Sequence, residues 1–196
     1  FNAETYTLPN NYQSVENITA LERGMSSNYT QAAVLSEALA SLYKEGDLRL
    51  DAYFKAADKN GYRFSQKSGK DDFRCSFRVG EMYLNSAEAA AQSDKLPQAR
   101  TRLLELMQKR YTPEAYTVKA TAVNAMTKEA LIQEILDERA RELAFEGHRW
   151  FDLRRTTRPR IEKVLKGGTY VLEQDDSRYT IQIPREAIAA NPELSN

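Results

Sequence analysis

The chain has very few of the residues that build catalytic and metal centres. Its 196 residues include one cysteine, Cys75, and one histidine, His148. One cysteine cannot form an internal disulfide or a cysteine-built metal site. The chain contains no G-x-S-x-G nucleophile elbow for the histidine to serve. We therefore expect no cofactor and no metal, and we interpret His148 as a structural packing residue. Cys75 is predicted to be a small buried residue on a helix that begins near Phe73.

The chain also lacks an excess of charge of one sign and a long hydrophobic run. The 28 basic residues balance 28 acidic ones, so no bulk field attracts nucleic acid or anionic lipid. Arginines are dense between Arg139 and Arg160, but interleaved acids favour pairing within the protein over a basic patch. No apolar run approaches a membrane span, and no segment has the pattern of a signal peptide. The length suits one domain, or one and a half, and is sufficient to bury a real core.

The segment from Glu138 to Arg155, E-R-A-R-E-L-A-F-E-G-H-R-W-F-D-L-R-R, is the most informative part of the chain. Thr127 is suited to cap a helix that ends before a left-handed Gly147, and a second helix is predicted over residues 149–156. Acids and arginines recur at three- and four-residue spacing, which predicts ion pairs along both helices. We therefore assign a structural role to these charged, aromatic and glycine positions: Glu138, Arg139, Glu142, Glu146, Gly147, Arg149, Trp150, Asp152 and Arg155.

Glu142 and Glu146 lie four residues apart on one helix face, which raises the alternative of a glycan-active enzyme. A glycosidase needs two carboxyl groups that flank a cleft. We expect three arginines to neutralise both acids and to lower their pKa, which suits a structural network better: Arg139, Arg141 and Arg149. Trp150 is expected to bury its ring and to stack under Arg154.

Hydrophobic periodicity predicts a mostly α-helical protein. Helices are expected over residues 31–44, 73–92, 94–110 and 127–146, with a short helix or turn at 47–54 and a last short helix at 185–189. Small residues such as Ala87 and Ala91 face leucines of the next helix, which predicts a tetratricopeptide-like helical hairpin.

The remaining segments are predicted as loops and a small sheet. Residues 1–30 have no clear period and residues 112–126 are a Thr- and Ala-rich connection, so both are predicted as loops. Residues 62–65 suggest a short strand, and residues 169–183 suggest a β-hairpin with its turn at 174–177. We divide the chain into a loop-rich part (1–72), a helical repeat core (73–160) and a hairpin with a tail (161–196).

Five of the eleven tyrosines fall in predicted loops or at helix ends, beside Asn, Gln and Thr. A flat aromatic ring with amide neighbours suits the C–H face and hydroxyl groups of a sugar. The alternative is that these rings serve local packing. The candidates for glycan binding are Tyr6, Tyr12, Tyr29, Tyr111 and Tyr116.

Several segments together resemble the SusD/RagB family of nutrient-binding proteins. Residues 138–155 carry part of this resemblance. Residues 78–91 resemble the family's helix of the form R-x-x-E-x-Y-L-x-x-A-E-A, since they read R-V-G-E-M-Y-L-N-S-A-E-A-A-A. Residues 183–194 resemble the family's ending and read I-P-R-E-A-I-A-A-N-P-E-L. Asp47–Arg49 matches a D-x-R element of the family. The matches follow the family's order from residue 47 to residue 194.

The resemblance implies that the chain is the C-terminal portion of a longer surface lipoprotein. Its membrane contact would then come only through a lipid anchor outside this chain. The implied role is non-catalytic capture of a polysaccharide, an oligosaccharide or another nutrient at the bacterial outer membrane, for delivery to a SusC-like TonB-dependent transporter. In this family the ligand surface lies largely in loops, so residues 138–155 would be scaffold. Two alternatives stay open: a helical-repeat adaptor that binds a peptide, and the glycan-active enzyme.

Overall fold

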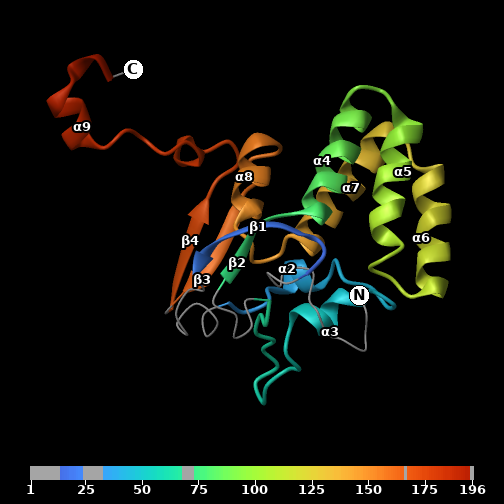
Figure 1. Cartoon of the computed structure of the whole chain (residues 1–196). Coiled ribbons are helices and arrows are strands. Elements are labelled where there is room, and N and C mark those ends of the chain that lie inside the picture. Colours follow the sequence, from blue (N-terminus) through green and yellow to red (C-terminus); the bar gives the residue numbers. More distant parts are fainter. Residues whose placement is uncertain (1–13, 24–32, 68–72, 166, 195–196) are drawn as a thin grey trace. The chain divides into compact units, whose positions relative to one another are not determined.

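The chain forms two compact units, Phe1–His148 (unit 1) and Arg149–Asn196 (unit 2). The computed structural model describes residues 14–23, 33–67, 73–165 and 167–194, and only the backbone of residues 20–23, 73–76 and 165 (Figure 1). None of the helices in this described part is both long enough and apolar enough to cross a membrane.

Four helices form the centre of unit 1: α4 (Val79–Gln92), α5 (Leu96–Met107), α6 (Pro113–Ala125) and α7 (Lys128–Glu142). α4 packs against both α5 and α7, and α6 lies along α5 (Figure 1). Leu84, Leu103 and Ile135 are completely buried in the apolar core between them. Ala87 of α4 and Ala99 of α5 are buried as well, and these short side chains let the two helices approach closely. The prediction of a mostly helical protein with an α4–α5 hairpin is confirmed.

Helix α6 occupies residues that we predicted as a loop, so that prediction was wrong. The Thr112 side chain caps the helix by accepting a hydrogen bond from the backbone N–H of Ala115, and Pro113 and Glu114 fill the first turn. Periodicity concealed the helix because Val123 is its only fully buried residue. The Thr-Pro-Glu sequence was the available signal.

A two-stranded antiparallel sheet pairs β1 (Asn17–Arg23) with β2 (Phe73–Arg78). We predicted a helix from Phe73, but α4 begins only at Val79, so Cys75 lies in a strand. Apolar residues alternate with polar ones from Phe73 to Arg78, which is the period of a strand. The helical pattern that follows masked this short alternation.

The described stretch between β1 and β2, residues 33–67, is mostly irregular. Its helices are short: α2 (Glu37–Ala40) covers a fraction of the helix predicted at 31–44, and α3 (Arg49–Tyr53) confirms the short helix at 47–54. Isolated bridges join Val34 to Phe64 and Phe54 to Ser65, in place of a strand at 62–65. A second, small apolar cluster packs Tyr43, Tyr53 and Phe54 against Ala144, just beyond α7.

Unit 2 begins with the second residue of α8 (His148–Arg155) and continues into a hairpin of β3 (Ile161–Leu165) and β4 (Gly168–Leu172). We predicted that residues 169–172 pair with residues 179–183, which follow them in the chain. In the structure β4 pairs instead with β3, which precedes it. Gly167, with a φ of +80°, supplies the left-handed residue that the tight turn between the strands uses. The second predicted strand is absent from the structure: a 3-10 helix, η1 (Ser177–Tyr179), ends where that strand should begin, and residues 180–183 are irregular.

The end of unit 2 contains α9 (Arg185–Ala190) and a second 3-10 helix, η2 (Pro192–Leu194). α9 confirms the last predicted helix. The Trp150 ring stacks on the ring of Tyr179 with a centroid separation of 5.1 Å, and we wrongly expected Trp150 to stack under Arg154. Tyr179 is fully buried, and its hydroxyl donates a hydrogen bond to the Pro159 carbonyl.

Candidate functional site

Three acids on one face of α7 and the turn after it form the centre of a buried ionic network. Glu138 and Glu142 are four residues apart and share one face of α7, and Glu146 follows in the turn after the helix. The side chains of Glu138 and Glu142 are 0% exposed. Isolated buried carboxylates would be very unfavourable, so each of them needs cationic partners.

Glu142 binds three arginines that come from three different segments. Arg110 donates from Nε to Oε2 and from Nη2 to Oε1, both at 3.0 Å. Arg78 donates to Oε1 at 2.5 Å, and Arg49 donates to Oε2 at 3.1 Å. Both carboxylate oxygens are therefore occupied by guanidinium groups.

Glu138 binds two arginines and a tyrosine. Arg49 donates to its Oε1 at 2.7 Å, and Arg141 donates from Nε to its Oε2 at 2.8 Å. The Tyr111 hydroxyl donates to Oε2 at 3.3 Å. Asp47 completes the arrangement, since its Oδ2 accepts from Arg49 at 2.8 Å. The D-x-R element thus brings one acid and one arginine into the same cluster.

Glu146 accepts hydrogen bonds from Arg78 and Lys67, which also cap the C-terminus of α7. Lys67 Nζ donates to the carbonyls of Glu142 at 2.9 Å and Ala144 at 3.0 Å, and Arg78 Nη2 donates to the Glu142 carbonyl at 2.5 Å. Carbonyls at a helix end have no partner within the helix and carry partial negative charge. Two cations therefore stabilise this helix end as well as Glu146.

The network fixes the protonation states of its acids. Burial alone would raise the pKa of Glu138, but Arg49 and Arg141 outweigh it and lower the pKa to about 2. For Glu142, burial is outweighed by Arg110, Arg78 and Arg49, which hold its pKa well below the usual range. Acids that stay ionised and covered by guanidinium groups cannot exchange a proton with a ligand in solvent.

The partners of these acids differ from those that we predicted. Arg141 pairs with Glu138 and Glu134. Arg139 donates to Asn85 at 2.6 Å and lies 4.0 Å from Glu88. Arg149 is exposed, and no ion pair of the described residues includes it. The prediction that these three arginines neutralise Glu142 and Glu146 was therefore wrong.

The cations that neutralise Glu142 and Glu146 come from positions distant in the sequence: Arg49, Lys67, Arg78 and Arg110. Local helical spacing could not find them. The available signals were the D-x-R element and the first arginine of the R-x-x-E helix, which supply Arg49 and Arg78.

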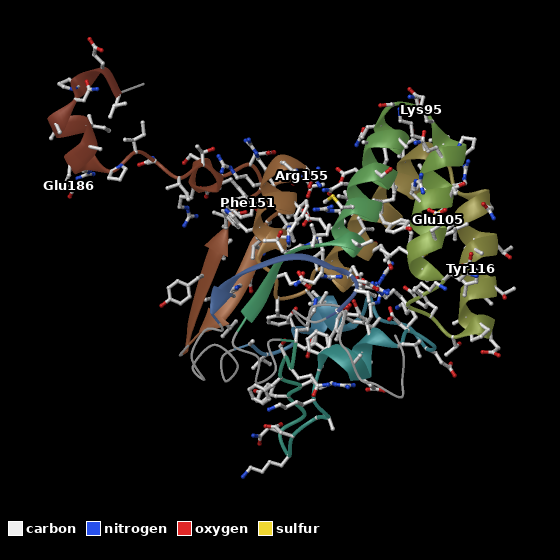
Figure 2. The ribbon with its side chains drawn as sticks, viewed as in Figure 1. Lys95, Glu105, Tyr116, Phe151, Arg155 and Glu186 are labelled. Carbon is white, nitrogen blue, oxygen red and sulfur yellow. The ribbon has the colours of Figure 1, made fainter. Side chains whose placement is uncertain are left out.

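The helix break and the second helix follow the prediction more closely. Gly147 adopts a left-handed conformation, with a φ of +88°. Asp152 is buried and binds Arg155 of α8 at 2.7 Å (Figure 2). These residues, like the network, hold the backbone in place.

The tyrosine candidates are distributed unevenly over the structure. Tyr6, Tyr12 and Tyr29 lie outside the described residues. Tyr111 is only 4% exposed, and its hydroxyl accepts from Arg49 at 3.0 Å, so its ring supports the network. Tyr116 lies on α6 and packs, partly buried, against the helical core (Figure 2). In the described part of the chain, no group of three or more histidines, cysteines or acids is placed to hold a metal ion.

Three solved structures have a similar fold. They are a SusD-like carbohydrate binding protein from Bacteroides vulgatus (TM-score 0.65, 18% identity), a SusD superfamily protein from Bacteroides fragilis (0.71, 20%) and one from Bacteroides thetaiotaomicron (0.69, 22%). The matches cover 99%, 97% and 96% of this chain, and 51%, 47% and 50% of theirs. The chain thus spans about half the length of these proteins.

The likeness confirms the predicted fold class, mostly α with tetratricopeptide-like hairpins and a small β-hairpin. A search of curated proteins finds no match. Comparison with protein families matches residues 10–196 to the SusD family. Because this match extends over nearly all of the sequence, the chain belongs to the SusD family.

Proposed function

We propose that this protein captures a glycan at the bacterial outer-membrane surface, without catalysis, and delivers it to a SusC-like TonB-dependent transporter. Membership of the SusD family supports a role in nutrient binding. The similar protein from Bacteroides vulgatus is a SusD-like carbohydrate binding protein, which favours a polysaccharide or oligosaccharide over other nutrients. Membrane attachment would come from a lipid anchor.

One observation carries the non-catalytic part of the proposal. Glu138 and Glu142, the acids at the centre of unit 1, are completely buried and bound to arginines. A glycosidase requires two carboxyl groups at the substrate, one of which must be able to donate a proton. Capture needs neither, because a preformed surface can hold the glycan while the transporter supplies the driving force for uptake.

The test is affinity gel electrophoresis of the complete natural protein over a panel of polysaccharides, with product analysis of the same mixtures. We expect one polysaccharide to retard the protein and its chain length to stay unchanged. Shortened products would favour the glycan-active enzyme. No retardation by any polysaccharide would overturn glycan capture, and recovery of a bound peptide would then favour the helical-repeat adaptor.

A further inference from the structure

Residues 55–64, between α3 and β2, form a protruding loop that folds back on itself (Figure 1). At its base the backbone N–H of Lys55 donates to the Phe64 carbonyl at 2.9 Å. Nearer its tip the N–H of Asp58 donates to the Tyr62 carbonyl, also at 2.9 Å. The tip therefore consists of five residues, Asp58 to Tyr62, in the sequence D-K-N-G-Y.

The tip is held rigidly without help from the Tyr62 ring. Asp58 Oδ1 accepts from the backbone N–H groups of Asn60 at 2.8 Å and Tyr62 at 2.9 Å. Gly61, with a φ of +82°, supplies the left-handed residue that the turn uses. Side-chain hydrogen bonds to the backbone of this kind stabilise turns.

The loop is also anchored to the rest of unit 1. Arg63 donates to Asp51 at 2.6 Å and to the Lys55 carbonyl at 3.0 Å. Gln66 donates to the carbonyls of α3, and the next residue, Lys67, is bound within the buried network. A rigid scaffold therefore positions the tip in advance, which lowers the entropic cost of binding a ligand.

This rigid tip presents an open aromatic ring. Tyr62 is 54% exposed, and no ring of the described residues packs against it. Lys59 and Asn60 precede it, are exposed, and have side chains that no described residue binds. The ring offers a flat apolar face, while the amide, the ammonium and the tyrosine hydroxyl offer hydrogen bonds to hydroxyl groups.

From this arrangement we infer that Tyr62 is a stacking platform for a sugar ring of the captured glycan, with Asn60 and Lys59 binding hydroxyl groups at its edge. This inference rests on the proposed function and gives it a location. The site was missed from the sequence because residues 62–65 suggested a strand, and a strand would not hold Tyr62 at the tip of a loop.

The chain supplies a matched control for this site. Tyr170 on β4 is 63% exposed, but its ring lies against Gly168 and its cross-strand neighbour is Lys163. It is thus an exposed tyrosine without the amide-bearing tip. Tyr62→Phe is a second control, because it keeps the stacking face and removes one hydroxyl.

The experiment uses the complete natural protein and the polysaccharide that retards it most. In calorimetric titrations we expect Tyr62→Ala to weaken binding roughly tenfold, since it removes the stacking surface. Tyr62→Phe should change the Kd by less than about threefold, and Tyr170→Ala should leave it unchanged. All three variants should melt like the parent protein, because the exposed rings contribute little to the core. Oxidative footprinting should show that the glycan protects Tyr62 and leaves Tyr170 accessible.

Each failure has a distinct meaning. If the parent binds a glycan and Tyr62→Ala binds it equally well, the platform is overturned while glycan capture stands. If Tyr62→Ala weakens only the association with the transporter, the tip is a protein-binding surface and the platform is again overturned. If the parent binds no glycan at all, both proposals fall.

Discussion

The two compact units contain ion pairs of similar geometry in opposite surroundings. In unit 1, Arg78 and Glu142 approach to 2.5 Å with side chains that are 1% and 0% exposed. In unit 2, Arg160 and Glu162 approach to 2.7 Å with side chains that are 50% and 45% exposed. Water screens the attraction within the second pair and solvates each of its charges when the pair separates. The first pair is buried, so no water solvates a charge that has lost its partner. Distance therefore says little about what each pair contributes to stability.

The two units also differ in what they bury. The network of unit 1 joins Asp47, Arg49, Arg78, Arg110 and the acids of α7, so several segments depend on each other. The described residues of unit 2 bury mainly Tyr179 and Asp152. We expect mutations of the buried network in unit 1 to be severe and mutations of exposed charged residues in unit 2 to be mild.

The largest effect is expected for Glu142→Ala. Removal of this carboxylate leaves Arg49, Arg78 and Arg110 buried without the acid that they share. Loss of one partner of a buried pair typically costs about 3–5 kcal/mol, a large part of the stability of an ordinary domain. Urea unfolding followed by far-ultraviolet circular dichroism, which reports the helices, measures the loss.

Arg149→Ala is the matched control for this variant, because Arg149 belongs to the same sequence segment but is exposed. Its free energy of unfolding should stay within about 0.5 kcal/mol of the parent protein. Equal losses of stability in the two variants would mean that the buried network around Glu142 stabilises the protein no more than the exposed Arg149 does.

A smaller effect, about 3 kcal/mol for Glu138, is expected on acidification. The pKa of Glu138 is about 2 in the folded protein and near 4.5 when unfolded, so the unfolded chain binds more protons between these values. The stability from Glu138 is complete above pH 4.5 and is lost as the pH falls towards 2. Urea unfolding at pH 6, 4 and 3 tests this, and a free energy that stays constant would contradict it.

Glu138→Gln is the control for the acid titration, because the amide keeps the shape of the side chain and does not titrate. The variant should be less stable than the parent at pH 6. Its remaining loss of stability on acidification should be smaller, since Glu142 and Glu146, whose pKa values are also lowered, still titrate. Parallel pH profiles for the two proteins would show that Glu138 contributes nothing to the titration.

Features set by neighbouring residues could be predicted from the sequence. The Thr127 side chain caps α7 as expected, and Glu138 pairs with Arg141 one turn away. Gly147 is left-handed as expected, although α7 ends at Glu142, four residues before the predicted end, and a turn over residues 143–147 leads to α8. Each of these depends on residues within about one turn of the helix, so spacing alone reveals them.

Features set by distant residues could not be predicted in the same way. Arg49 and Glu138 are separated by 89 positions, and no local pattern relates them. The backbone of α6 was missed for a different reason. A helix that buries only Val123 has almost no apolar stripe, so its capping residues were the sole evidence for it.

An intermediate effect is expected for Gly80→Ala at the start of α4. A Cβ atom at this position would lie 2.8 Å from Arg78 Nη1 and 2.8 Å from Glu142 Oε1. Both atoms belong to the buried network and cannot withdraw into solvent, so the added methyl group must separate them. We expect a loss of about 1–3 kcal/mol in urea unfolding. At an unobstructed helix position the same change would stabilise the protein by about 0.5–1 kcal/mol, so a gain in stability would contradict the close contact.

The smallest effect is expected for Arg160→Ala in unit 2. Arg160 lies 2.7 Å from Glu162 of β3 and 3.4 Å from Glu173, which follows β4, so by distance alone it has two good partners. All three side chains are at least 45% exposed, and water can replace each lost contact. Trp150 is the only tryptophan and stacks on Tyr179 in the same unit, so its fluorescence reports this region directly. We expect the fluorescence midpoint in urea to coincide with that of the parent protein. A shift as large as that of Glu142→Ala would mean that exposed and buried pairs contribute alike, against the contrast between the two units.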